Sequence, residues 1–323
     1  MKKYLGVLAA LALAAAAVGD WVYEGQWGSY GAGNAMFMYP EGIAVTSGGN
    51  VYVADTYGYR IQYFTATGSY LGQWGSFGSG DGRFLNPRGP AVAPGSGNVY
   101  VADTQNSRIQ YFTATGSYLG KWGSPGGGSG NGQFNRPYDL TFGPDGNVYV
   151  ADTYNNRIQY FTATGSYLGK WGSPGTGEGQ LGYPEGIAFN SGGNVYVVEA
   201  YNHRVQYFTA TGSYLGNWGT LGTGNGEFDT PRDVAVGPDG TVFVTDMNNN
   251  RVQYFTASGS YLGQWGSSGS GNGQFNLPTG VCLNASGSRV YVADWYNHRI
   301  QYFKWSSPTV EPASLGRVKA LFK

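Results

Sequence analysis

Short apolar runs separated by polar turn residues dominate this chain, and apolar positions at helical spacing are absent from its repeated part. Runs such as "GIAV", "NVYVAD", "RIQYF" and "SYLGQW" are rich in β-branched and aromatic residues and are bounded by Gly, Asn, Asp or Pro. This pattern is typical of short antiparallel strands. The chain is therefore predicted to be all-β.

The strand pattern recurs along the sequence. A block running from "VYVAD" to "RIQYF" occurs six times, and its acidic residue marks the copies at intervals of 48, 49, 47, 47 and 48 residues: Asp55, Asp103, Asp152, Glu199, Asp246 and Asp294. In each copy a Pro opens a first strand, a turn leads to a second, a four-residue loop leads to a third, and a "TATGS"-like turn leads to a fourth that ends in Trp. Periods of this length are typical of propellers and other repeat arrays.

Six copies of four strands predict a six-bladed β-propeller with four antiparallel strands per blade. The fourth strand is displaced by one copy. Its Trp residues are Trp27, Trp74, Trp122, Trp171, Trp218 and Trp265, so its first instance lies before the first copy. The last copy ends with its third strand, at "RIQYFKW", and has no fourth strand of its own. A ring closed by the N-terminal strand, which completes the last blade, explains this offset and leaves no unpaired edge at the seam. A stacked solenoid would instead need capping repeats at both ends.

The repeated unit, "P-x-G-I-A-V … G-N-V-Y-V-A-D-x-x-N-x-R-I-Q-Y-F", resembles the NHL repeat, over roughly residues 21 to 303. The resemblance implies a six-bladed propeller. It does not imply a single activity, since NHL-type propellers include RNA binders, protein-interaction modules, sensor ectodomains and a few lyases.

Both ends of the chain differ from the repeats. Residues 1–19 are interpreted as a signal peptide, because Lys2 and Lys3 precede an Ala-rich apolar run that is short for a membrane span. Residues 20–305 form the predicted propeller. Residues 306–323 are interpreted as a C-terminal tail, either a short helix begun by Ser314, a sorting segment, or a frayed end. The protein is therefore expected to be secreted or attached to the cell envelope, with no membrane span in the mature chain.

The charge balance argues against a nucleic-acid partner. The formal net charge is zero and only 12% of residues are charged, whereas 16% are aromatic. A neutral surface lacks the basic patch that binds a phosphate backbone. RNA binding, although the resemblance allows it, is therefore not predicted.

Residues that recur in every blade are interpreted as scaffold. An Arg follows each repeated acid by five positions, as in Asp152 and Arg157, and a bidentate contact across the hairpin is expected. Paired carboxylates could also act as a general acid and base, but a catalytic pair in every blade is implausible. The repeated Trp, Tyr and Phe residues are expected in the core between blades.

Residues that differ between blades are the candidates for ligand binding. The top face is defined as the end that carries the loops between second and third strands and the connectors between blades. Its predicted ligand-binding residues at the channel mouth are Glu41, Arg88, Tyr138, Glu185, Arg232 and Thr279. Those on its hairpin loops are Tyr57, Tyr59, Tyr154, Tyr201, His203, Trp295, Tyr296 and His298. An aromatic rim around a mixed-charge mouth suits a protein, peptide or glycan, although loop drift would also produce such variation.

Catalytic signals are weak. A catalytic zinc usually takes three protein ligands, and the chain has two histidines, whose counterparts in other blades include Asn156 and Asn250. Cys282 lies in a strand-like run, where a buried thiol is inert. No metal, cofactor or catalytic residue is predicted, and the protein is expected not to be an enzyme.

We therefore predict an exported, non-catalytic scaffold that binds through its top face. The resemblance keeps one alternative open, a metal-assisted lyase or lactonase at the channel mouth. The near-identical blades favour another, a structural component of a surface array or filament.

Overall fold

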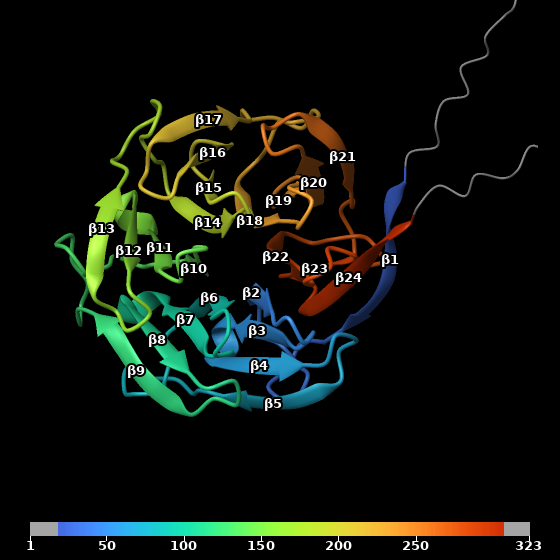
Figure 1. Ribbon diagram of the computed structural model, residues 1–323. Coiled ribbons are helices and arrows are strands. Elements are labelled where there is room, and N and C mark those ends of the chain that lie inside the picture. Colours follow the sequence, from blue (N-terminus) through green and yellow to red (C-terminus); the bar gives the residue numbers. More distant parts are fainter. Residues whose placement is uncertain (1–18, 307–323) are drawn as a thin grey trace, which may run out of the picture.

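The structure is a computed structural model that describes residues 19–306, and it is a ring of six four-stranded antiparallel sheets around a central channel (Figure 1). The predicted six-bladed propeller is confirmed. Blade 1 contains β2 (Pro40–Val45), β3 (Val51–Asp55), β4 (Arg60–Phe64) and β5 (Tyr70–Trp74). Blade 2 contains β6 (Pro87–Val92), β7 (Val99–Asp103), β8 (Arg108–Phe112) and β9 (Tyr118–Gly123). Blade 3 contains β10 (Asp139–Phe142), β11 (Val148–Asp152), β12 (Arg157–Phe161) and β13 (Tyr167–Trp171).

The remaining blades repeat this order. Blade 4 contains β14 (Pro184–Phe189), β15 (Asn194–Glu199), β16 (Arg204–Thr209) and β17 (Tyr214–Trp218). Blade 5 contains β18 (Pro231–Val236), β19 (Val242–Asp246), β20 (Arg251–Phe255) and β21 (Tyr261–Trp265). Blade 6 contains β22 (Pro278–Leu283), β23 (Arg289–Asp294), β24 (Arg299–Ser306) and β1 (Asp20–Trp27). Single 3-10 turns, η1 (Thr56–Gly58), η2 (Thr104–Asn106) and η3 (Thr153–Asn155), occupy the top loops of blades 1 to 3.

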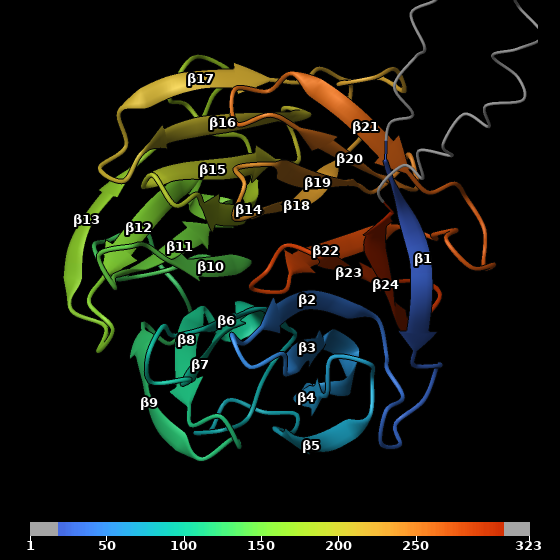
Figure 2. The same ribbon diagram turned by 45° about the vertical axis from the view of Figure 1, so that its right-hand side comes forward.

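The N-terminal strand closes the ring, as predicted. β1 pairs antiparallel with β24, with Gly25 opposite Tyr302 and Trp27 opposite Ile300, and the two strands lie side by side (Figure 2). Trp27 also packs on Phe64 of blade 1, at 5.5 Å between ring centroids. The first and last strands of the propeller are therefore joined by both a hydrogen-bond ladder and a shared core.

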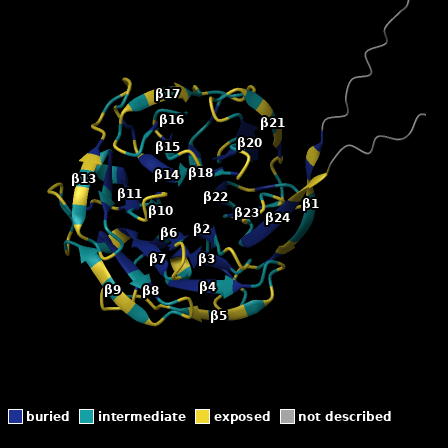
Figure 3. Cartoon of the chain, viewed as in Figure 1, coloured by how far each residue is buried: buried dark blue, intermediate teal, exposed yellow. Residues whose placement is uncertain are grey.

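The core lies between the blades, and within the sheets most of the exposed positions are on the outer strands (Figure 3). One cluster joins Val51 and Val53 of blade 1 to Tyr291 and Ile300 of blade 6, and the other junctions repeat this arrangement. Both faces of the inner strands are buried in this way, so their sequences are nearly continuous apolar runs rather than alternating ones.

The glycine of each "TATGS" turn packs against a Trp of the preceding blade. Gly68 has φ of +90°, and a Cβ built on it would lie 2.7 Å from the indole of Trp27. Only glycine tolerates both this backbone conformation and the close contact with the indole. The equivalent glycine of each later copy packs on the Trp of the preceding blade: Gly116 on Trp74, Gly165 on Trp122, Gly212 on Trp171 and Gly259 on Trp218.

The repeated acid and Arg form a buried hub in each blade. Arg157 Nε lies 2.7 Å from Asp152 Oδ2, while its Nη1 and Nη2 donate to the Ser129 and Gly130 carbonyls at 2.6 and 2.8 Å. The expected bidentate contact is found in blade 4, where Arg204 Nε and Nη2 lie 2.6 and 3.4 Å from the two carboxylate oxygens of Glu199. Arg157 contacts one oxygen of its acid, because its other guanidinium nitrogens bind backbone carbonyls. Asp152 Oδ1 accepts the Asn135 N–H at 2.8 Å. The pair thus holds the connector from the preceding blade against the hairpin.

The two terminal predictions, the signal peptide and the tail, fall almost entirely on residues 1–18 and 307–323, outside the described residues. They remain predictions. Between residues 19 and 306, no helix is long and apolar enough to cross a membrane.

Candidate functional site

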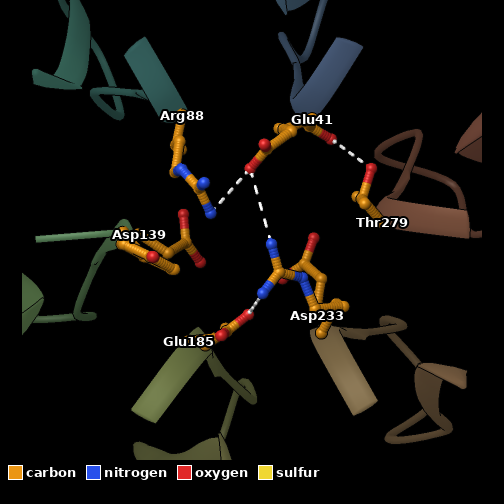
Figure 4. A pocket seen from close by; sticks show the side chains of 12 residues that line it. Glu41, Arg88, Asp139, Glu185, Asp233 and Thr279 are labelled. Carbon is orange, nitrogen blue, oxygen red and sulfur yellow. Dashed lines mark hydrogen bonds and ion pairs between the residues drawn. The ribbon is translucent and has the colours of Figure 1, made fainter. Parts of the chain in front are cut away.

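The six residues predicted at the channel mouth do line one opening (Figure 4). They come from the first strand of each blade, or from the residue just before it in blade 3. The six first strands converge on the channel axis at this end. Arg88 Nη1 lies 2.9 Å from Glu41 Oε2. Arg232 pairs with Glu185, and its Nη2 is 3.7 Å from the same Glu41 oxygen. The mixed charges of the mouth therefore neutralise one another across the channel.

The mouth is filled by its own side chains. The guanidinium carbon of Arg88 lies 3.9 Å from the centroid of the Tyr138 ring, and the Thr279 hydroxyl donates to the carbonyls of Pro40 and Glu41, each at 3.3 Å. Only about 40 Å³ remains open, whereas small-molecule pockets usually measure about 300–1,000 Å³. A ligand that binds here would lie on the ion pairs rather than within them.

Burial changes the acid–base properties of the mouth. It raises the pKa of Glu185, although the neighbouring Arg232 opposes the shift. It also raises the pKa of Tyr138, against the opposing effect of Arg88. The phenol is therefore neutral at physiological pH.

The two histidines hold loops of neighbouring blades. His203 Nδ1 accepts the Thr230 N–H at 3.1 Å, and His298 Nδ1 accepts the Tyr39 N–H at 3.2 Å. In blades 3 and 5 the same position is an Asn, whose side-chain amide oxygen accepts the equivalent N–H. Asn156 accepts the Tyr183 N–H at 2.8 Å, and Asn250 accepts the Leu277 N–H at 2.9 Å. All four residues have φ between 51° and 55°, a left-handed conformation in which Asn and His are enriched.

This shared role accounts for the histidines without a metal. Burial lowers the pKa of His298, which favours the neutral ring that can accept a hydrogen bond. Among residues 19–306, no group of three or more His, Cys, Asp or Glu side chains is arranged to hold a metal ion. Ligand binding by His203 and His298 remains a prediction.

Five predicted loop aromatics lie in two groups on the top face, and each group contains a central tyrosine that was not predicted. At the junction of blades 6 and 1, Tyr39 lies between Tyr57 and Trp295, at 5.3 and 5.0 Å between ring centroids, and 5.6 Å from Tyr296. Tyr57 and Tyr296 are 42% and 47% exposed. We call Tyr39, Tyr57, Trp295 and Tyr296 the seam aromatic group.

The second group runs outward from the mouth over blades 3 and 4. Successive ring centroids are 6.1 Å apart from Tyr138 to Tyr154, 5.1 Å from Tyr154 to Tyr183, and 6.0 Å from Tyr183 to Tyr201. Tyr201 is 72% exposed at its outer end. We call these four residues the outer aromatic group.

Tyr59 belongs to neither group. Its ring packs against Phe77 of the next connector, at 5.0 Å between centroids.

The central residues Tyr39 and Tyr183 were missed, although a signal for them exists. Each immediately precedes the Pro that opens a blade, and that position varies along the chain: Tyr39, Asn86, Arg136, Tyr183, Thr230 and Leu277. A comparison of the six copies at this position, rather than at the loops alone, would have selected both tyrosines.

Asp139 and Asp233 were also not predicted, because their position was not compared between the six copies. The residue after each mouth position is Gly42, Gly89, Asp139, Gly186, Asp233 or Gly280. Asp139 Oδ2 accepts the Ile187 N–H at 3.1 Å and Asp233 Oδ2 accepts the Val281 N–H at 2.8 Å. Each aspartate thus reaches from its own blade to the inner strand of the next, just below the mouth.

Comparison with known proteins places these features in a family. The NHL repeat profile matches residues 37–64, 134–161, 181–208, 228–255 and 275–303. This chain belongs to the NHL-repeat family. The second copy, which has Pro90 where other blades carry Ile, Leu or Val, lies outside the matched ranges but forms the same four strands. Comparison with curated proteins gives no match.

Solved structures with this fold have varied functions. A streptogramin B lyase aligns with a TM-score of 0.60 and 17% identity, over 84% of this chain and 94% of the lyase. A virginiamycin B lyase from Staphylococcus aureus aligns with a TM-score of 0.58 and 16% identity, over 83% and 95%. A gluconolactonase from Xanthomonas campestris aligns with a TM-score of 0.64 and 15% identity, over 84% and 88%. At these identities the likeness concerns the propeller fold alone.

The half-buried Asp233 should make the stability of this NHL propeller depend on pH. Burial raises its pKa to about 7 from 3.8, although Arg232 and the N–H groups of Val281 and Val234 oppose the shift; the nearby acids are Glu185 and Asp139. Between pH 3.8 and about pH 7 the Asp233 carboxyl keeps its proton in the folded state but has lost it in the unfolded chain. The free energy of unfolding therefore falls as the pH rises through this range.

Replacing Asp233 by Asn removes this titration. We expect Asp233→Asn to flatten the decline between pH 4.5 and 8 and to raise the free energy of unfolding at pH 8 by on the order of 2–3 kcal/mol. Urea denaturation across this range measures it. Asp239→Asn, an exposed change in the same blade, should leave the decline intact. Identical pH curves for Asp233→Asn and the unchanged protein would contradict the assignment.

Proposed function

We propose that this NHL propeller is an exported, non-catalytic scaffold that binds a glycan or peptide through its top face. The observation that carries the proposal is the pair of aromatic groups, which expose tyrosine rings on the top face. Export is supported by the basic residues and short apolar run at the N-terminus.

Tyrosine rings suit such a ligand because each offers a broad apolar face and a hydroxyl group, with few rotatable bonds to order on binding. Two of the rings are held in place by neighbouring residues. In the outer aromatic group, Arg136 lies 4.8 Å from the Tyr154 ring centroid, and the backbone N–H of Tyr183 is held by Asn156. A preorganised aromatic surface loses little entropy on binding, which favours recognition of extended polar chains.

The mouth favours binding over turnover. Its two glutamates are engaged by arginines and its open space is about 40 Å³, so a substrate on the top face could not reach these glutamates without breaking ion pairs. The aromatic groups instead present a surface beside the mouth, on which a ligand can lie without rearrangement of the blades.

A glycan and peptide array probed with residues 20–323 tests the proposal, followed by titration of the best ligand. We expect Tyr201→Ala and Tyr296→Ala each to weaken binding by about tenfold, the usual effect of removing an interfacial tyrosine. Gln105→Ala is the matched control, since Gln105 occupies the same loop position in blade 2. It should bind as the unchanged protein does.

Two results would overturn the proposal. One is equal binding by all three variants, which would place the ligand elsewhere. The other is stoichiometric zinc or calcium in the purified protein together with a lyase or lactonase activity that is lost when the metal is removed.

A further inference from the structure

Below the ion pairs of the mouth the channel widens into a second, larger space. This lower chamber has a volume of about 460 Å³ and extends to exposed residues of the bottom turns, including Pro94, Pro238 and Ala285. Its volume is in the range of small-molecule sites. It is separated from the top face by the mouth residues, so a ligand would enter it from the bottom face.

The wall of the lower chamber combines backbone and apolar groups. It is built by the innermost strands β2, β6, β10, β14, β18 and β22, each of which is the terminal strand of its sheet. Such an edge leaves backbone N–H and C=O groups without a strand partner. Between them lie apolar side chains such as Val45, Phe142 and Leu283. The wall can therefore contact methylene groups and also accept hydrogen bonds through its carbonyls.

Among residues 19–306, the charged side chains that line the lower chamber are Asp139 and Asp233 alone, at its closed end. Their carboxyl groups project into the channel from blades 3 and 5 (Figure 4). Four other blades have glycine at this position, so the two acids are departures from the repeat rather than parts of its scaffold. Asp139 Oδ2 and both oxygens of Asp233 accept backbone N–H groups.

The nearby positive charges are already engaged. Arg88 pairs with Glu41, and Arg232 pairs with Glu185 and approaches Glu41. Two arginines thus face two glutamates, and the two aspartates have no cation of their own among the lining residues of the mouth or the lower chamber. An uncompensated carboxylate in a confined space is unfavourable, and a bound cation would stabilise it.

We propose that the lower chamber binds an aliphatic primary amine, with the ammonium group at Asp139 and Asp233 and the methylene chain along the channel. An ammonium group donates three hydrogen bonds and can therefore engage both carboxylates and a wall carbonyl together. The chain contacts the apolar side chains between the strand edges. This site is distinct from the proposed top-face site and does not depend on it.

Isothermal titration calorimetry at pH 8 with n-hexylamine and hexan-1-ol tests the proposal on the unchanged protein. The two probes have the same chain and differ in charge, and we expect the amine to bind at least about tenfold more tightly, as one charge-assisted contact would provide. Equal binding of the two probes, or no binding of the amine, would overturn the proposal.

A double variant locates the site. Asp139→Asn with Asp233→Asn keeps the shape of both side chains and should weaken n-hexylamine binding at least about tenfold. The matched control is Asp145→Asn with Asp239→Asn, which removes two exposed acids from bottom turns of the same two blades, and it should not change the affinity. Loss of affinity in the control alone would overturn the assignment. So would tight binding of calcium chloride that competes with the amine and needs the same aspartates, because it would indicate an inorganic-cation site.

Discussion

Replacing Arg157 by Met is expected to lower the free energy of unfolding by about 3–5 kcal/mol, the usual cost of removing one partner of a buried ion pair. Its partner Asp152 is fully buried, and Met cannot replace the hydrogen bonds that Arg157 donates to the Ser129, Gly130 and Gln133 carbonyls. Urea denaturation followed by tryptophan fluorescence measures the change.

An exposed ion pair is the control for this prediction. Lys121 pairs with Asp81 on the protein surface, where the two side chains are 44% and 53% exposed. Lys121→Met should cost less than about 1 kcal/mol, since solvent screens such pairs. If the two methionine variants were equally destabilised, the repeated Asp–Arg hubs would not carry the stability assigned to them.

Replacing Trp27 by Ala is expected to cost about 3–5 kcal/mol of unfolding free energy, as large-to-small changes of buried aromatics do. Trp27 is 8% exposed and packs between Phe64 of blade 1 and Tyr302 of blade 6. Because it lies in the strand that closes the ring, the loss should also open the seam locally. Amide hydrogen exchange of β1 and β24 should then be faster at temperatures well below global unfolding.

Trp171→Ala separates closure from simple loss of packing. Trp171 is 9% exposed and packs on Phe208, but it lies within a continuous stretch of chain between blades 3 and 4. It should cost a similar free energy of unfolding without a selective increase in exchange of β1. Normal protection of β1 in Trp27→Ala would be the contrary result, and it would mean that the backbone ladder alone holds the ring closed.

The number of blades, their strand order and their closure could be read from the sequence because each depends on a local pattern that is repeated. The acid and Arg five residues apart predicted a hairpin contact, and Asp152 does pair with Arg157. Arg204 makes the predicted bidentate contact with Glu199. Arg157 does not make it with Asp152, because the connector carbonyls of Ser129 and Gly130, some 28 residues away in the chain, compete for the guanidinium.

The candidate sites were only partly predictable. Loop variation selected Tyr57 and Tyr296, but Tyr39, which lies between loops of two blades, comes from a connector that had not been considered. His203 drew attention as a possible metal ligand, yet its Nδ1 accepts the N–H of Thr230 in the next blade. In both cases the partner belongs to a different repeat.

By itself, then, the sequence determined what each repeat does: its strands, its acid–Arg pair, and the displaced strand that must close a ring. Only the tertiary structure decided what happens where the six repeats converge. Side chains that meet on the channel axis, such as Glu41 and Arg232, lie in different blades and far apart along the chain. Whether they plug the mouth, and whether Asp139 and Asp233 share a chamber below it, depends on how far each strand reaches toward the axis, which no local pattern encodes.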